Sequence, residues 1–112
     1  MLNIQTRQSG NASVVSIQGK VNFEVTAQLR DVIRETVATA QPKLLAINLE
    51  GVSFIDSSGL GLLVAARNSV DKSGGKLHLC CLPATVKKSF DQTNLTNYFS
   101  IFATEQDALR GA

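Results

Sequence analysis

One short segment near the middle of the chain restricts the possible folds more than any other. Residues 44–49 read Leu-Leu-Ala-Ile-Asn-Leu, which is nearly continuously apolar. A short run of this kind is typical of a central strand that is covered on both faces. Strands of that kind belong to sheets flanked by helices, so the segment indicates an α/β fold.

The segments around this strand alternate between strand and helix periodicity. We expect strands at residues 2–5, 14–17, 44–49, 76–82 and 98–102, and helices at about 24–40, 57–72, 83–93 and just after Thr104, which has Asp107 three residues on. The first two strands, with a turn at 8–11, form an antiparallel hairpin that Gly19 ends, and residues 20–25 and 50–55 are connecting loops. This order predicts one α/β domain over residues 1–112, with a mixed, mostly parallel sheet of four to five strands, flanking helices and an N-terminal β-hairpin.

Composition and charge exclude several classes of protein. The chain has 112 residues and a net charge of +2, and its one adjacent basic pair, Lys87-Lys88, has no basic block or stacking aromatics around it. We therefore expect no direct binding of nucleic acid. No run approaches the ~20 apolar residues of a membrane span, and the N-terminal residues lack the features of a signal peptide.

The two cysteines, Cys80 and Cys81, are adjacent. Neighbours in a strand point to opposite faces, so we expect no disulfide between them, and a metal site would lack further ligands. The sequence predicts two buried thiols in a protein of the reducing cytoplasm. It contains no phosphate-binding Gly-x-x-x-x-Gly-Lys string, and we expect neither a metal nor a cofactor.

The start of the second predicted helix carries the most information. Residues 54–61 read Phe-Ile-Asp-Ser-Ser-Gly-Leu-Gly. Asp56 is expected to be the N-cap, although Ser57 or Ser58 could take that place. With Asp56 as the cap, Ile55 and Leu60 stand at the positions of a hydrophobic staple.

Two glycines, Gly59 and Gly61, lie in the first turns of this helix. Each costs about 1 kcal/mol relative to alanine in a helix interior, so helix formation alone does not account for them. Small residues here allow a close approach, either of a neighbouring strand or of a phosphate or a partner protein. Both explanations can apply.

A serine at this place is suited to phosphorylation. A phosphoryl group adds about −1.5 to −2 charge at neutral pH, and the free N–H groups and dipole of a helix N-terminus tolerate it. Asp56 next to it adds repulsion between like charges. We expect little change in the fold but the loss of a partner that fits the neutral serine, which is the behaviour of a switch.

These residues resemble a known family. Asn48-Leu49 and the string from Asp56 to Gly61 resemble the signature of the anti-sigma factor antagonists, the STAS domain family, and the segment from Gly19 to Asn22 is similar to that family's Gly-x-Leu/Val-Asp element. The resemblance implies that Ser57, with Ser58 as the less favoured acceptor, is phosphorylated by an anti-sigma factor that is a serine kinase. It also implies that the unphosphorylated form binds this kinase and frees a sigma factor, and that a serine phosphatase restores the binding form.

The resemblance also implies a partner-binding surface, with these members: Asn22, Phe54, Asp56, Ser57, Ser58 and Leu60. Asn22 stands where the family often has aspartate, which weakens any charge pairing with a basic residue of a partner, although asparagine still accepts a hydrogen bond.

Two other functions compete with this interpretation. An enzyme is not expected, because the Gly-x-Ser-x-Gly pattern of a nucleophilic serine is absent and the one histidine, His78, lies in a predicted strand with nothing to place it near Ser57. A STAS module that is not phosphorylated, and that acts as an interaction subunit of a transport or signalling complex through the same surface, remains the alternative.

Overall fold

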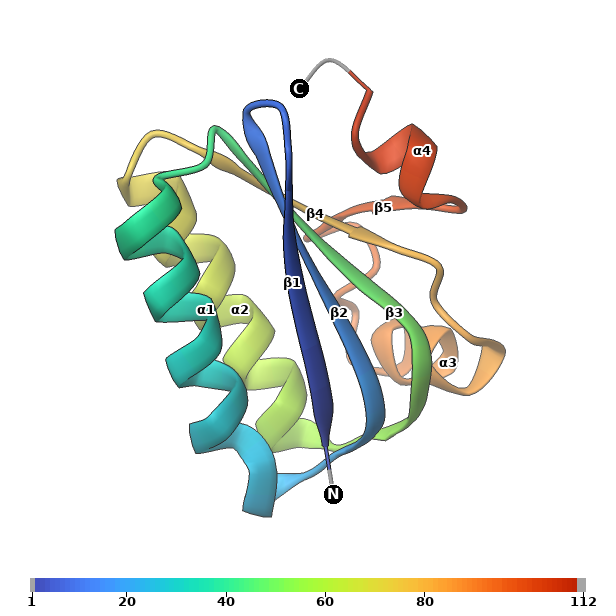
Figure 1. Cartoon of the computed structure of the whole chain (residues 1–112). Helices are drawn as coiled ribbons and strands as arrows, with labels where there is room; N and C mark the ends of the chain where they lie inside the picture. The colour runs from blue at the N-terminus through green and yellow to red at the C-terminus, as the bar shows by residue number, and fades with distance from the viewer. Residues whose placement is uncertain (1, 111–112) are drawn as a thin grey trace.

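The computed structural model describes residues 2–110 and contains a five-stranded sheet. The strands are β1 (Asn3–Ser9), β2 (Ala12–Val21), β3 (Leu44–Ile55), β4 (Lys76–Cys80) and β5 (Ser100–Phe102), and they lie side by side in this order. The pair β1–β2 is antiparallel and all other pairs are parallel (Figure 1). The predicted α/β fold with an N-terminal hairpin is therefore confirmed.

Three longer helices pack against the sheet and share its main core. They are α1 (Thr26–Ala40), α2 (Ser57–Lys72) and α3 (Ala84–Gln92), and α1 and α2 run side by side in the same direction (Figure 1). Their apolar residues join alternate residues of the strands in one buried cluster, which includes Val15, Ile17, Leu45, Ile47, Leu49, Leu79, Leu29, Ile33, Leu63, Val70, Val86 and Phe90. The burial of residues 44–47 on both faces agrees with the expectation of a central strand.

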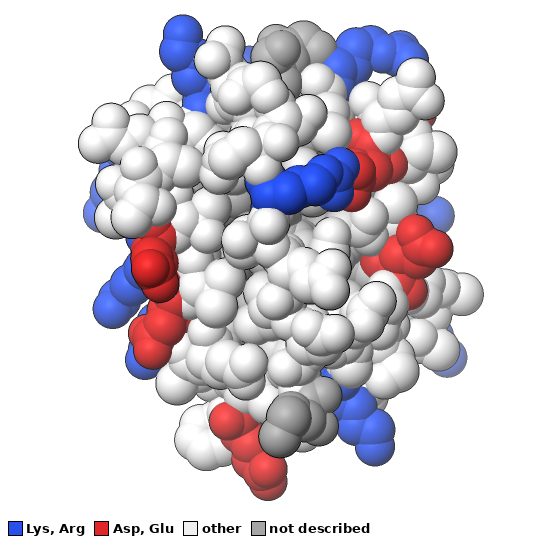
Figure 2. Space-filling view, viewed as in Figure 1, with Lys and Arg blue, Asp and Glu red and all other residues white. Residues whose placement is uncertain are grey.

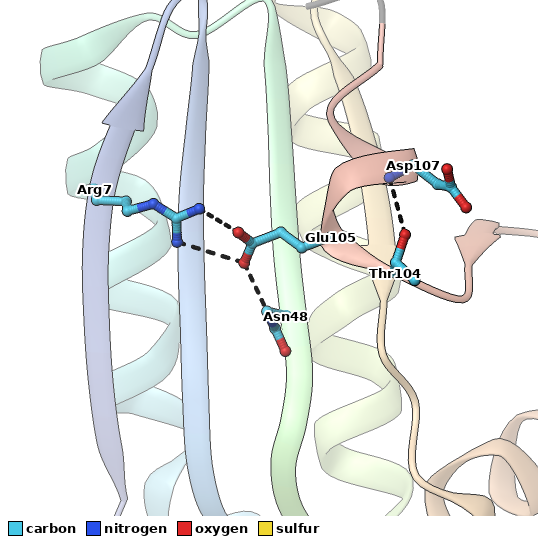
Figure 3. A network of polar contacts seen from close by, with 5 residues as sticks. All are labelled: Arg7, Asn48, Thr104, Glu105 and Asp107. Atoms are coloured by element: carbon cyan, nitrogen blue, oxygen red, sulfur yellow. Dashed lines mark hydrogen bonds and ion pairs between the residues drawn. The ribbon is translucent and has the colours of Figure 1, made fainter.

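The opposite face of the sheet is partly covered by the short helix α4 (Glu105–Ala108). Glu105 reaches across β3 to accept hydrogen bonds from Arg7 on β1 and from Asn48 on β3, the latter at 3.0 Å from Nδ2 (Figure 3). Thr104 caps α4 by accepting a hydrogen bond from the Asp107 N–H at 3.1 Å, as predicted. These contacts hold the C-terminal segment against the strands from the N-terminal half.

The expected loop at 50–55 is wrong, because β3 continues to Ile55. In its register with β2, Ser16 pairs with Asn48 but Gln18 pairs with Gly51, and a second shift follows at Lys20. Each shift places an extra residue in β3, so the buried residues Leu49, Val52 and Ile55 are spaced by three instead of two. Because of this spacing, apolar and polar residues do not alternate regularly in residues 50–55, and the sequence pattern does not indicate a strand there.

The expected end of the second strand at Gly19 is also wrong. Gly19 has φ +117°, a left-handed value that glycine adopts without strain, and it lies beside a register shift. The strand passes through this irregularity and ends at Val21. A single 3₁₀ turn, η1 (Phe23–Val25), then forms the second half of the loop that was predicted at 20–25.

Other boundaries agree more closely with the predictions. α2 spans the predicted residues, and α1 stops where expected, with Gln41 in the left-handed region before Pro42. β4 is shorter than predicted because Cys81 has φ +62° and leaves the strand conformation. Cys80 is buried, but Cys81 is only partly buried, so the expectation of two buried thiols is wrong for Cys81.

The surface shows no strong concentration of charge on the face drawn in Figure 2. A basic side chain meets an acidic one across the upper middle of this face, and the other charged side chains are scattered around its rim. In the described part of the chain, no helix combines the length and the apolar character needed to cross a membrane. Within residues 2–110, the His, Cys, Asp and Glu side chains do not gather in a group of three that could hold a metal ion.

Candidate functional site

The predicted site lies where β2 leads into η1 and β3 leads into α2, at the amino-terminal ends of α1 and α2 (the lower end in Figure 1). Asp56 links the two connections. Its N–H donates to the Val21 carbonyl oxygen at 3.1 Å, and its carboxylate oxygen Oδ2 accepts from the Phe23 N–H at 3.1 Å. The other oxygen, Oδ1, accepts from the Gly59 N–H at 3.0 Å. Asp56 is therefore the N-cap of α2, as expected, and it also fixes the chain after β2.

The two serines have different environments. Ser58 Oγ donates a hydrogen bond to Asp56 Oδ1 at 2.5 Å, and Ser58 is partly buried. This bond, together with those from the Gly59 and Phe23 N–H groups, lowers the pKa of the Asp56 carboxyl. Ser57 is exposed, and its hydroxyl forms no side-chain hydrogen bond with any of residues 2–110. The first serine of the pair is thus the accessible one.

The two glycines of α2 also have different environments. A Cβ on Gly59 would lie 2.8 Å from Ile55 Cγ1 and 2.8 Å from Val21 Cγ1, so this glycine is needed for the close packing of α2 on β2 and β3. A Cβ on Gly61 would have no atom within 4 Å, and Gly61 is exposed. Packing of the described residues explains the first glycine and leaves the second unexplained.

Two large apolar side chains are exposed close to Ser57. Phe54, which the sequence singled out, is 49% exposed, and Phe23 is 77% exposed. Phe23 was not predicted as a residue of the partner-binding surface, although it directly follows Asn22, which was. The backbone N–H of Phe23 donates a hydrogen bond to the Asp56 carboxylate, so the backbone that carries this exposed ring is fixed.

The remaining residues of the predicted surface differ in accessibility. Asn22 is partly buried, and its Oδ1 accepts a hydrogen bond from the Glu24 N–H at 3.1 Å, so it caps η1. Leu60 is only 5% exposed and lies in the main core with Ile55. Leu60 therefore offers little surface to a partner, because its position at the staple site directs its side chain inward, where it holds the first turn of α2 in place.

His78 has a structural environment. Its Nδ1–H donates to the carbonyl oxygen of Ala108 at 2.8 Å, and its ring lies against Phe102 with 4.7 Å between the ring centroids. His78 therefore attaches α4 to β4, on the side of the sheet where Glu105 lies. The structure does not bring this histidine together with Ser57.

Comparisons with known proteins extend over almost the whole chain. Residues 3–108 match the STAS domain family. The chain is 30% identical to the anti-sigma-B factor antagonist of Bacillus subtilis (strain 168) over 109 residues, which are 97% of this chain and 98% of the relative. It is 23% identical to the anti-sigma F factor antagonist of Paenibacillus polymyxa over 108 residues, which are 96% and 92% of the two chains.

Solved structures give the same picture. An anti-sigma factor antagonist from Mycobacterium paratuberculosis superposes with a TM-score of 0.88 and 27% identity, covering 97% of this chain and 92% of that one. SpoIIAA, an anti-sigma factor antagonist, in its unphosphorylated form gives a TM-score of 0.81 at 25% identity, covering 96% and 93%. These relatives antagonise anti-sigma factors, which is a regulatory and not a catalytic role. The chain, by its sequence and by its fold, belongs to the STAS domain family together with anti-sigma factor antagonists.

Proposed function

We propose that this protein is an anti-sigma factor antagonist that is switched by phosphorylation of Ser57. In its unphosphorylated form it binds an anti-sigma factor that is also a serine kinase, and a sigma factor is freed. A serine phosphatase reverses the modification, and the exchange takes place in the cytoplasm. The observation that carries the proposal is the exposed, unbonded hydroxyl of Ser57 at the first residue of α2.

The geometry favours Ser57 over Ser58 as the acceptor. The Ser58 hydroxyl is held by Asp56 at 2.5 Å and would have to give up this bond, and the cap would lose a partner, before the hydroxyl could attack ATP. Modification of Ser57 requires no such loss. The domain can therefore carry the phosphoryl group without losing its helix cap.

The electrostatics explain how one modification would act as a switch. A phosphoryl group on Ser57 would lie at the positive end of the α2 dipole, which stabilises it within the folded domain. It would also lie next to the Asp56 carboxylate, whose lowered pKa keeps it charged at neutral pH. The local charge would change from about −1 to between about −2.5 and −3, enough to repel a partner that fits the unphosphorylated surface.

The exposed side chains around Ser57 fit a protein partner. Phe54 and Phe23 offer exposed apolar area, and aromatic residues of this kind often contribute most of the binding energy of an interface. Asn22 lies at the same place, although its Oδ1 is already used as a cap. The partner surface proposed for this chain is thus Asn22, Phe23, Phe54, Asp56, Ser57 and Ser58.

The structures of relatives support a switch that leaves the fold unchanged. SpoIIAA has been solved in an unphosphorylated and in a phosphorylated form, and both share this fold, with TM-scores of 0.81 and 0.73 to this chain. In that protein, the domain keeps its architecture in both forms.

The proposal is tested by phosphorylation in vitro. The protein is incubated with ATP and each candidate anti-sigma kinase of its organism, and the modified residue is mapped by mass spectrometry. We expect one phosphate on Ser57 in the wild-type protein, none in Ser57→Ala, and a phosphate that still maps to Ser57 in Ser58→Ala. Ser57→Ala should keep kinase binding, whereas Ser57→Asp should weaken it by about tenfold or more, because it places a charge in the contact.

The alternative function predicts a different result. A STAS interaction subunit of a transport or signalling complex would not be labelled by any candidate kinase. It would also not bind these kinases, so Ser57→Asp would have no binding to weaken. Such a result would discard the switch and leave the alternative.

A further inference from the structure

A second surface lies away from Ser57, between α1 and α2. The two helices leave a groove with a volume of about 220 Å³, lined by the apolar residues Ile33, Val37, Leu62 and Ala66. Ile33 and Ala66 are buried and form its floor. Sites for small molecules usually measure about 300–1,000 Å³, so this groove is smaller than most of them, and its size suits an apolar side chain that anchors a protein partner.

The charged residues that line the groove are all basic. Among the described residues that line it, the charged ones are Arg30 and Arg34, one turn apart on α1. Arg30 Nε lies 3.8 Å from Asp31 Oδ1, a long and exposed pair that contributes little. Among residues 2–110, Arg34 has no carboxylate oxygen within 4.0 Å. The rim therefore offers two guanidinium groups that can bind a carboxylate from outside.

An exposed line of small residues connects this groove to the switch site. Ser57, Gly61, Ala65 and Ser69 follow one another at intervals of four on α2, and all four are exposed. Ala65 and Ser69 also line the groove. Twelve residues of helix span about 18 Å, so one partner of ordinary interface size can reach both sites. This line also gives Gly61 a role that packing inside the domain does not.

We propose that the groove is a second docking point for the anti-sigma partner, and that it takes an apolar side chain flanked by a carboxylate on an amphipathic segment of that partner. The inference rests on the function proposed above. The apolar floor selects the side chain, and Arg34 and Arg30 select the acidic group beside it. The groove lies outside the immediate surroundings of Ser57, so it contributes affinity and partner choice, whereas Ser57 decides whether binding occurs.

The test measures binding of the anti-sigma kinase to unphosphorylated variants by calorimetry. We expect Arg34→Glu to weaken binding about tenfold, because it reverses a charge in the contact, and Arg34→Lys to keep most of the affinity. Ala65→Phe, which fills the groove, should weaken binding by a similar factor. Lys72→Glu, a matched charge reversal on α2 outside the groove lining, should change it by less than about twofold. Thermal unfolding of each variant verifies that the domain is folded.

The outcomes separate the two proposals. If Ser57→Asp weakens kinase binding but Arg34→Glu and Ala65→Phe bind like the Lys72→Glu control, the groove is not a docking point and the switch stands. If the wild-type protein binds no candidate kinase, both proposals fail. A direct map supports the result: titration of the ¹⁵N-labelled protein with the kinase should shift the amide resonances of Ala38 and Ala65 as well as that of Ser57, and unchanged groove resonances would overturn the inference.

Discussion

At the scale of single residues, neighbours that look equivalent in the sequence have different tasks. Asp56 is bound to three N–H or O–H donors, so it is fixed by the structure that it caps. Ser58 is one of these donors and Ser57 is not. The site therefore combines the Asp56 carboxylate, which three hydrogen bonds fix in position, with the free hydroxyl of Ser57. The fixed cap at Asp56 keeps Ser57, the next residue, in place.

The two glycines of α2 provide a test at this scale. Gly59→Ala should lower the free energy of unfolding by about 1–3 kcal/mol, because its Cβ would lie 2.8 Å from Val21 Cγ1 and 3.1 Å from the Val21 carbonyl oxygen. Gly61→Ala should raise it by about 1 kcal/mol, because its Cβ meets open space and alanine favours the helix. Urea denaturation measures both variants. Equal effects of the two substitutions would show that Gly59 is not in close packing.

At the scale of elements, the C-terminal helix is attached to strands that are distant in the sequence. Arg7 and Asn48 both donate to the carboxylate of Glu105, and His78 donates to Ala108 (Figure 3). The hydrogen bond from Arg7, followed by that from Asn48, lowers the pKa of the Glu105 carboxyl. The side chain of Glu105 is 25% exposed, so water partly screens these interactions.

This attachment should depend on pH in a defined direction. A carboxyl whose pKa is lower in the folded than in the unfolded state stabilises the fold above its unfolded pKa, and this contribution is lost as the pH falls through the folded pKa. Glu105→Gln should therefore reduce the free energy of unfolding by about 1 kcal/mol at pH 7 and by much less in acid, near and below the folded pKa.

Urea denaturation at pH 7 and in acid measures this difference. Gln106→Ala, a substitution at the next residue of α4 whose side chain is exposed, serves as the matched control and should have little effect at either pH. The same loss of stability at both pH values in Glu105→Gln would contradict a charged contact.

At the scale of the whole molecule, the two sides of the sheet differ. One side carries the main core that the longer helices share, and the other is partly covered by α4. Cys80 lies within this architecture, fully buried, and burial raises the pKa of its thiol to about 12. Cys81, one residue further and in the left-handed region, is partly exposed.

The reactivity of the cysteines should report on this arrangement. Burial raises the pKa of the Cys80 thiol and keeps it from solvent, so Cys80 in a Cys81→Ser variant should resist iodoacetamide until the protein unfolds. Cys81 in a Cys80→Ala variant should react readily in the folded protein. Mass spectrometry after timed alkylation, with and without urea, follows both. Equal rates in the folded state would show that Cys80 is not protected.

Much of the architecture and of the candidate site could be predicted from the sequence, because those features are local. The α2 helix, its Asp56 cap, the end of α1 at Gln41-Pro42 and the cap at Thr104 depend on residues within a few positions of each other. Residues 50–55 could not be assigned to β3, because the bulges that alter their periodicity exist only in the pairing with β2.

The sequence by itself determined the order of elements and the position of the serine pair, since period, caps and glycines act over one or two turns. Only the tertiary structure decided which serine is free, that Leu60 is buried, and that Phe23 stands exposed beside Asp56. It alone also formed the groove between α1 and α2. These features arise from contacts between segments that are distant in the sequence, and such contacts are set by how the whole chain packs.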